Sequence, residues 1–278
     1  MEIMEIIKEA LIFPSQNLEK LAIYIVITVV LAFLVAGGAI FGVLGFMDSS
    51  FYLVFSVILF VIGIIVALII TGYQVGLLKS GIDHDESAPG FDWKNDLMTG
   101  IKMLVVSIVY FIIPAIITLI MVFLTNIPGQ FYDIVQKAAI TPANATAVAS
   151  SASPVLIGVS KAAVASLFGA VAFTVLVAVI VFIIFAFLQS MGESRLANTG
   201  DLGEALNIPE AFRDITRIGV GKVVAVIVLI AIVILVIQGV LSYLYGQVPQ
   251  LSIINIVITP YLAFFAQRAV GLLYSDIA

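Results

Sequence analysis

The fold is decided by a stretch without a single charged side chain, FYLVFSVILFVIGIIVALIITGYQVGLL, which is residues Phe51–Leu78. A transmembrane helix needs about 20 predominantly apolar residues to cross roughly 30 Å of hydrocarbon. The stretch exceeds that length, so it predicts a membrane-spanning helix.

Five further stretches have the same character and predict five more spans. They are Leu21–Met47, Met103–Thr125, Ala162–Met191, Val223–Tyr245 and Leu251–Gln267. Three residues join the first span to the second and five join the fifth to the sixth, so both pairs form tight hairpins. We therefore expect an all-α membrane protein with six transmembrane helices, forming a single polytopic domain over residues 1–278. The longer spans are expected to tilt or protrude.

The composition agrees with a membrane protein and excludes several classes of function. Hydrophobic residues make up 63% of the chain and charged residues 10%, whereas about a quarter of a soluble domain is charged. A net charge of −5 argues against a nucleic-acid partner, which would require clustered Lys and Arg. The absence of cysteine excludes disulfides and thiolate chemistry. Glu2, Glu5 and Glu9 stand where a cleavable signal would be basic, so none is expected.

Lysine and arginine are distributed unequally between the two sides of the predicted membrane. Only Lys137 and Lys161 fall on the side of the loop 126–160. The other ten are Lys8, Lys20, Lys79, Lys94, Lys102, Arg195, Arg213, Arg217, Lys222 and Arg268. The positive-inside rule therefore predicts cytoplasmic termini, cytoplasmic loops 79–102 and 192–222, and an external loop 126–160.

All seventeen acidic residues also fall outside the predicted spans. Proton relays and many ion-coupled carriers need ionisable side chains at membrane depth, so tight coupling to ions is not expected. Arg268 comes closest to a span, and we expect its long side chain to reach the interface.

The even-numbered spans end in similar sequences. Gly76–Ser80 and Gly271–Ser275 both read Gly-Leu-Leu-x-Ser after a glutamine, and Gln189–Ser194 is a looser match. A short segment with an aromatic residue and a lysine precedes each odd-numbered span. We interpret the chain as three tandem units, each an amphipathic interfacial helix followed by a two-span hairpin. The alternative is a chance resemblance between apolar helices.

Two of the three interfacial segments have clear helical patterns. Apolar residues of the first recur at helical spacing: Ile3, Ile6, Ile7, Ala10 and Leu11. In the third, Asn207 is a predicted N-cap, with Pro209 in the first turn and Glu210 completing a capping box. The middle segment, 91–102, has the weakest apolar stripe.

The loop 126–160 is expected to contain a short helix around Phe131–Ala139 and then a stretch rich in Ala, Ser, Thr and Pro. Asn144-Ala145-Thr146 forms an N-glycosylation sequon, which makes Asn144 a candidate glycosylation site.

Small residues and prolines inside the spans predict helix contacts and bends. Glycines four residues apart occur at Gly38/Gly42 and Gly72/Gly76. Such pairs let helices approach closely in lipid, within one chain or between subunits. Pro114 and Pro260 predict kinks, either static or acting as a gating hinge. Asn255 and Thr259 are positioned to satisfy backbone groups freed by Pro260.

Sequence motifs for catalysis or metal binding are weak. Asp83-His84-Asp85-Glu86 offers carboxylates and an imidazole, but one histidine cannot build a catalytic zinc site, so a solvated acidic loop is expected. No P-loop, Gly-x-Ser-x-Gly or His-Glu-x-x-His stretch occurs. We therefore expect no catalytic residue, metal or cofactor. A salt-bridged surface is expected from Arg195, Asp201, Glu204, Arg213 and Arg217.

Two loops carry a family resemblance. The first loop contains Gly72–Gly76, Pro89–Trp93 and Gly100–Lys102; the second contains Arg195–Gly200, Glu204–Asn207 and Gly219–Lys222. Together they resemble a family of archaeal and bacterial multi-pass membrane proteins classed as domain of unknown function 4013. The resemblance implies that the protein lies in the cytoplasmic membrane of an archaeon or a bacterium, with an archaeon favoured. It supplies no activity, so no functional residues are carried over.

These observations favour a non-enzymatic membrane protein that binds or organises lipid, or scaffolds membrane partners, through its interfacial helices. The alternative is an uncoupled transporter or channel for an uncharged or lipidic substrate, with a path lined by backbone, Tyr, Ser, Thr and Gln. A membrane enzyme ranks third. The expected partners are membrane lipids, with a second copy or another membrane protein as further candidates.

Overall fold

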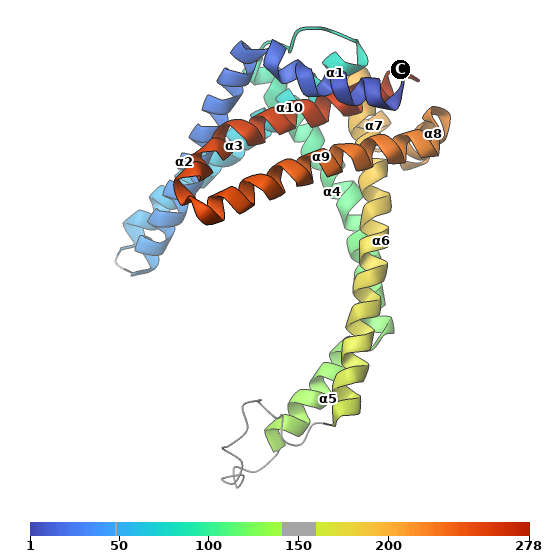
Figure 1. The fold of residues 1–278 in the computed structure, drawn as a ribbon. Helices are drawn as coiled ribbons and strands as arrows, with labels where there is room; N and C mark the ends of the chain where they lie inside the picture. The colour runs from blue at the N-terminus through green and yellow to red at the C-terminus, as the bar shows by residue number, and fades with distance from the viewer. Residues whose placement is uncertain (48, 141–159) are drawn as a thin grey trace. The chain divides into compact units, whose positions relative to one another are not determined.

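The computed structural model describes residues 1–47, 49–140 and 160–278. Within them, the regular secondary structure is helical throughout (Figure 1). The elements are α1 (Ile3–Gln16), α2 (Leu18–Met47), α3 (Ser50–Ile82), α4 (Trp93–Leu124), α5 (Ile127–Ile140), α6 (Lys161–Thr199), α7 (Leu202–Ala205), α8 (Ile208–Ile218), α9 (Val220–Gln247), the 3₁₀ helix η1 (Pro249–Ile254) and α10 (Asn255–Tyr274).

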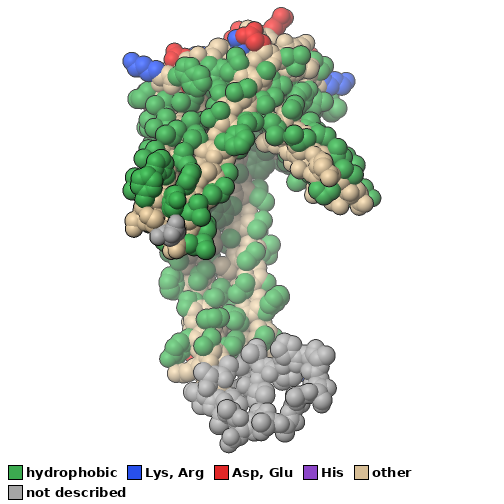
Figure 2. Space-filling view, turned by 90° about the vertical axis from the view of Figure 1, so that its left-hand side faces the viewer, with side chains coloured by type: hydrophobic (Ala, Val, Ile, Leu, Met, Phe, Trp, Pro, Cys, Tyr) green, Lys and Arg blue, Asp and Glu red, His purple; other side chains and the backbone are tan. Residues whose placement is uncertain are grey.

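The predicted fold class is confirmed. The helices long and apolar enough to cross a membrane number six in the described part: α2, α3, α4, α6, α9 and the continuous η1–α10 segment. Most extend several residues beyond the predicted spans, because amphipathic or polar turns continue the same helices. Large apolar side chains cover much of their outer surface, as Figure 2 shows. Lipid, rather than water, is the solvent that such a surface requires.

The chain forms two compact units. Unit 1 comprises Met1–Ile108 with Phe187–Ala278, and unit 2 comprises Val109–Ala186. In unit 2, the Phe111 and Phe182 rings of α4 and α6 lie 5.4 Å apart. The Ser166 hydroxyl of α6 donates to the Gln130 side chain at 2.9 Å, which ties α5 to α6. The expected short helix is therefore present as α5, whereas Asn144 lies outside the described residues.

In unit 1, α10 contacts α1, α2, α3 and α9. Glycine permits two close helix crossings. A Cβ added at Gly72 of α3 would lie 1.8 Å from the Asp96 carbonyl oxygen of α4, and one added at Gly100 would lie 1.9 Å from the Leu68 carbonyl oxygen. At the second crossing, a Cβ at Gly271 of α10 would lie 2.2 Å from a carbonyl oxygen of α3. Larger residues at these positions would force the helices apart.

The three-unit interpretation needs one correction, in its middle unit. The first and third interfacial helices are present as α1 and α8, each followed by a hairpin of long helices. Residues 93–102, however, form the first turns of α4 and are not a separate helix. The other two units break between helices, at Asn17 and at Gly219 with a φ of 104° that favours glycine. The middle unit has no such break.

The caps of the interfacial helices partly match the predicted chemistry. The Asn207 side chain accepts from the Glu210 N–H at 3.3 Å, so the predicted N-cap of α8 is present. The Glu210 carboxylate pairs with Arg213 and Arg217 instead of closing a capping box. On α1, Ile6, Ile7 and Ala10 are buried as expected, whereas Ile3 is half-buried and Leu11 is exposed.

Candidate functional site

The candidate site lies along residues 72–76 of α3, which separate two cavities of unit 1. Because an α-helix has 3.6 residues per turn, residues two apart point to nearly opposite sides. Gly72 and Gly76 line a cavity of about 240 Å³, which we call the polar cavity. Gln74 lines a second cavity of about 340 Å³, the apolar pocket.

The apolar pocket is bounded by three membrane-spanning helices. Its lining residues are Tyr24, Thr28, Val29 and Ala32 of α2, Gln74 of α3, and Asn255, Ile256, Thr259, Pro260 and Ala263 of α10. The start of α2 lies beside the second half of α10, because the Tyr24 ring packs edge-on against Phe264 with centroids 5.4 Å apart. Tyr24 and Ala32 are eight residues apart, as are Asn255 and Ala263. At 1.5 Å per residue, the pocket extends along the helices for about 12 Å.

Polar groups lie toward the two ends of this pocket. Toward one end, the Gln74 side-chain amide donates to the Tyr24 hydroxyl at 2.7 Å. The nearby Thr28 hydroxyl donates to the Ile25 carbonyl at 2.8 Å, so it is also satisfied. Toward the other end, the Oδ1 atom of Asn255 is buried and has no hydrogen-bond partner among the described residues. A mostly apolar pocket with a few fixed polar groups is typical of sites for uncharged ligands.

Pro260 lies in the α10 wall of the same pocket and is buried. Proline lacks an N–H, so it leaves the carbonyl of Ile256 without its helical donor. We expected Asn255 and Thr259 to satisfy such groups. In residues 1–47, 49–140 and 160–278, neither side chain forms a hydrogen bond to that turn, so this expectation was wrong.

The polar cavity is formed where the two quoted loops meet. It is lined by residues of α3, of the first turns of α4, and of the end of α6: Gly72, Val75, Gly76, Lys79, Asn95, Asp96, Thr99, Lys102, Leu196, Ala197, Thr199 and Gly200. The Lys102 ammonium donates to the Gly200 carbonyl at 2.7 Å. The buried Asp96 carboxylate accepts from the Asp92 N–H at 3.0 Å. The first of these contacts fixes α4 to the end of α6, and the second caps the start of α4.

Beside the polar cavity, the loop after α3 folds back onto α3. The Tyr73 ring stacks on Phe91 with centroids 3.8 Å apart, and its hydroxyl donates to the Pro89 carbonyl at 3.1 Å. Asn17 accepts from the Ala88 N–H at 2.7 Å and donates to the Glu86 carbonyl at 3.2 Å. The residues of the first quoted loop therefore pack together around Tyr73.

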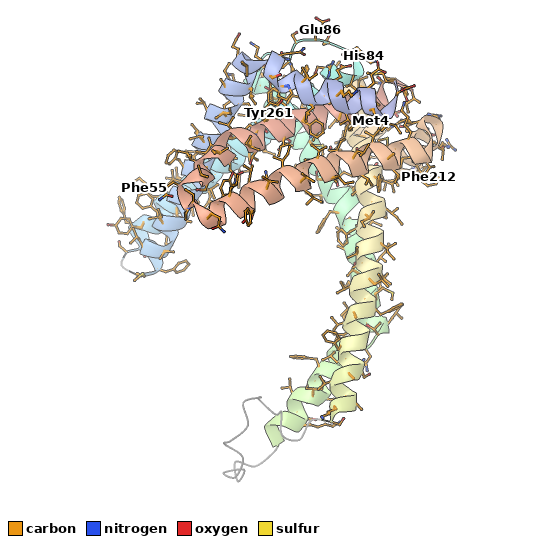
Figure 3. The ribbon with its side chains drawn as sticks, in the orientation of Figure 1. Met4, Phe55, His84, Glu86, Phe212 and Tyr261 are labelled. Carbon is orange, nitrogen blue, oxygen red and sulfur yellow. The ribbon has the colours of Figure 1, made fainter. Side chains whose placement is uncertain are left out.

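The acidic part of this loop faces outward, and Figure 3 shows His84 and Glu86 beside α1. Asp83, His84, Asp85 and Glu86 are exposed. Among the residues with assigned positions, no group of three or more His, Cys, Asp or Glu side chains is arranged to hold a metal ion.

Arg268, whose side chain we expected at the interface, is buried within the protein. Its guanidinium donates to the Ser80 and Asp85 carbonyls, both at 2.6 Å, and to the Glu9 carboxylate at 2.7 Å. It also lies 4.5 Å from the centre of the Phe13 ring. Helix α1 therefore covers Arg268 and supplies its counter-charge. No local sequence signal indicates this pair, because Glu9 and Arg268 lie 259 residues apart.

The expected salt-bridged surface forms between α6, α7 and α8. Arg195 pairs with Asp214 at 2.8 Å and with Glu204, and Arg217 pairs with Asp214 at 3.1 Å. Asp214 was missed as its centre: it is 1% exposed and also accepts from the Tyr274 hydroxyl at 3.2 Å. Asp201 caps α7 instead of joining an ion pair.

A smaller ion pair ties the start of α9 to the end of the chain. Lys222 pairs with Asp276 and donates to the Met1 carbonyl at 2.6 Å. Burial alone would raise the pKa of Asp276, but hydrogen bonds from Lys222 and the Met1 amino group outweigh it and lower the pKa.

The remaining predicted packing and kink residues have different neighbours. The Ser56 hydroxyl of α3 donates to the Gly38 carbonyl at 2.7 Å, and a Cβ at Gly42 would lie 3.1 Å from the same hydroxyl oxygen. A Cβ at Gly76 would lie 3.4 Å from the Pro89 ring. In unit 2, Pro114 lies within α4, where its carbonyl accepts from the Thr118 hydroxyl at 2.8 Å.

Comparison with protein families gives one match that covers most of the chain. The chain belongs to the family described as Protein of unknown function (DUF4013), whose model matches residues 55–246. That range includes both quoted loops and therefore all of the residues that line the polar cavity. No curated protein and no solved structure matches the chain.

Proposed function

We propose that this chain is a non-enzymatic integral membrane protein that binds a lipidic molecule in the apolar pocket. The observation that carries the proposal is the pocket itself, a slot between α2, α3 and α10 with polar groups toward both ends. No Lys, Arg, Asp or Glu lines it. An ionised ligand would therefore lose its hydration without gaining a counter-charge.

The position of the pocket favours a ligand that arrives from the bilayer. Its walls belong to helices whose outer surfaces expose large apolar side chains, such as Val26 and Val30 of α2 and Val257 of α10. A hydrocarbon chain entering the slot would exchange contacts with lipid for contacts with Val29, Ala32 and Ile256 at little net cost. Selectivity would then come from the polar groups.

The interfacial helices play a different part in this proposal from the one that we expected. Helix α1 turns its apolar stripe toward α10 and toward Arg268, so that face is not available to lipid. We therefore assign lipid binding to the pocket and a closing role to α1. The Tyr261 hydroxyl of α10 supports this, because it donates to the Leu11 carbonyl of α1 at 2.6 Å (Figure 3).

We place the protein in a cytoplasmic membrane, in an archaeon in preference to a bacterium, with both termini in the cytoplasm. The support is the ten-to-two distribution of Lys and Arg between the two predicted sides. Because the chain has no native cysteine, single cysteines can test this. An impermeant thiol reagent added to intact cells should spare a Thr199→Cys variant and modify a Ser150→Cys variant. The reverse pattern would overturn the orientation.

A second function, uncoupled transport of an uncharged or lipidic molecule, is favoured by one observation. Pro260 interrupts the hydrogen bonding of α10 within the pocket wall, where a bend could open the slot. Passive flux into vesicles containing the purified protein, insensitive to proton and sodium gradients, would support transport. Binding without flux would leave lipid binding as the function.

Lipid retention by purified protein tests the leading proposal. Wild-type protein and an Ala32→Trp variant would be purified in a mild detergent, and bound lipids would be identified by mass spectrometry. The bulky indole should fill the slot and remove most of the bound lipid. An Ala22→Trp variant provides the control, because Ala22 is exposed on α2 and does not line the pocket. Equal lipid content in all three proteins would contradict the proposal.

A further inference from the structure

We infer that the polar cavity is a second binding site, which takes a zwitterionic group, with the ammonium of the ligand at Asp96 and its anionic group at Lys79. The polar cavity lies on the other side of residues 72–76 from the apolar pocket and shares no lining residue with it. The inference therefore goes beyond the proposed function and does not depend on it.

The polar cavity adjoins another of about 410 Å³, which we call the acidic cavity. Four residues line both cavities: Gly76, Lys79, Asn95 and Asp96. The charged residues that line only one of them differ in sign, with Lys102 in the polar cavity and Asp83, Asp85 and Asp92 in the acidic cavity. A ligand bound where the two cavities meet would therefore have cations toward one end and carboxylates toward the other.

The Asp96 carboxylate is the first argument. Asp96 is 6% exposed, and it forms no ion pair within the described part of the chain. Its Oδ2 atom accepts from the Asp92 N–H at 3.0 Å. Its Oδ1 atom has no hydrogen-bond partner in the described residues and is not among their fully buried unpaired atoms, so it keeps accessible surface where Asp96 lines the cavities. A largely buried carboxylate without a counter-charge is costly, so a cationic group on a ligand is the partner that it lacks.

The Lys79 ammonium is the second argument. Lys79 lines both cavities, yet it pairs neither with Asp96 nor with any other carboxylate of the described residues. Lys102 donates one hydrogen bond to the Gly200 carbonyl and has two further N–H groups to offer. The lysines and Asp96 thus line one space without neutralising one another. A simple anion or cation would satisfy one sign only, whereas a zwitterion satisfies both.

The surroundings of the cavity allow such a ligand to come from the membrane or from water. On the first turns of α4, Trp93 and Met98 are 55% and 53% exposed on either side of Asn95 and Asp96, which is typical of a turn at the membrane interface. Asn95 and Lys79 are also exposed. Phosphoethanolamine carries an ammonium and an anion, and it exists both as a lipid headgroup and as a soluble molecule, so it is the probe for both sources.

The test measures the rate at which a thiol in the cavity is modified, in the full chain in maltoside micelles. Because the chain has no native cysteine, Asn95→Cys places one thiol where the cavities meet. Lys94→Cys is the control, because Lys94 is exposed and lines neither cavity.

Each zwitterion is compared with an isostere in which a methyl group replaces the ammonium. Soluble phosphoethanolamine is compared with propyl phosphate, and phosphatidylethanolamine in mixed micelles with phosphatidylpropanol. At least one zwitterion should protect position 95 at about one-tenth of the concentration that its isostere needs, as expected for a charge-assisted hydrogen bond. Position 94 should not respond. Protection by the soluble compound or by the lipid identifies the source of the ligand.

Three variants in the Asn95→Cys chain assign the two charges. Asp96→Asn keeps an acceptor for the Asp92 N–H and should abolish the preference for the zwitterion over its isostere. Lys79→Gln should weaken protection by both compounds about tenfold. Glu86→Gln is the control and should change neither, because Glu86 is exposed in the same loop as Asp85 but lines neither cavity.

Three outcomes would overturn the inference. One is equal protection by each zwitterion and its isostere, and another is a preference that survives Asp96→Asn. The third is that none of the four compounds protects position 95. Lipid binding in the apolar pocket would be unaffected by any of them, because Asn95 and Asp96 do not line that pocket.

Discussion

Helices α1 and α8 occupy the same place in the first and third of the three tandem sequence units, yet they dock by different chemistry. The contact face of α1 is mainly apolar: Ile6, Ala10 and Phe13 are at most 1% exposed. The centre of the α8 contact is the buried carboxylate of Asp214, which holds Arg195 and Arg217. A shared topological position therefore does not require a shared docking chemistry.

The difference follows from what each helix covers. Helix α1 lies on α10 and encloses a single charge, Arg268, so most of its contact can be apolar. Helix α8 follows the charged end of α6, and Arg195 there requires an anion. Removing apolar groups should therefore release α1, whereas removing one carboxylate should release α8.

The largest expected effect comes from changing Ile6 and Ile7 to Ser together. Each buried isoleucine side chain contributes about 1.5–3 kcal/mol, so docking of α1 should weaken by about 3–6 kcal/mol. Hydrogen exchange of the α1 amides should become faster, while α8 stays protected. Reversing the exposed Glu2 and Glu5 to Lys is the control; it removes the capping box of α1 and should speed exchange only in the first turn. Release of α1 by the charge reversal alone would show that a specific ionic contact, and not the apolar stripe, holds the helix.

The next effect is expected at α8, from Asp214→Ala. The change leaves Arg195 with only its more exposed partner Glu204, and breaking a buried ion pair costs about 3–5 kcal/mol. Exchange should quicken in α8 and at the end of α6, but not in α1. A Glu210→Ala variant removes a more exposed carboxylate, which pairs with Arg213 and Arg217 of the same helix, and should cost about 0–1 kcal/mol. If both variants behave alike, Asp214 is not the centre of the contact.

The smallest effect concerns the Lys222–Asp276 pair, which is partly exposed. Because the pKa of Asp276 is lowered in the folded chain, the pair stabilises the fold fully above the unfolded carboxyl pKa of about 3.9. Its contribution is lost as the pH falls through the lower, folded value. Protection of the last residues against exchange, relative to the intrinsic exchange rate at each pH, should thus be unchanged from pH 7 to pH 5 and fall only below about pH 4. An Asp276→Asn variant should lack this acid transition; a transition near pH 6 in the wild type would exclude Asp276 as its cause.

The contrast between the two helices also shows what sequence could predict. The six spans, α5, and the positions of α1 and α8 follow from apolar length, 3.6-residue periodicity and local caps, all of which are encoded in neighbouring residues. The continuity of residues 93–102 with the span of α4 was not predicted, because a weak amphipathic stripe does not reveal whether the helix continues into the span. Asp214 was not included in the predicted salt-bridged surface, since its partner Arg195 lies across a chain reversal.

The apolar pocket was beyond sequence reasoning for a physical reason. Its polar groups come from three helices, and Gln74 and Tyr24 meet across 50 residues of chain. Periodicity shows which face of a helix is apolar, but not which faces come together or where they leave a gap. The buried Arg268 escaped prediction in the same way. The unusual Tyr and Gln residues within otherwise apolar spans were the available signal, and we had proposed such residues as the lining of a path.

Protection of a pocket cysteine by lipid tests the central claim most directly. In a chain without native cysteine, a Thr259→Cys variant places one thiol in the pocket, and a Val61→Cys variant places one on the exposed surface of α3. The measured quantity is the rate of thiol modification in detergent, with and without added neutral long-chain alcohol. Our account predicts a rate that falls on addition of the alcohol at position 259 and does not change at position 61. Equal changes at both positions would contradict lipid binding in the pocket.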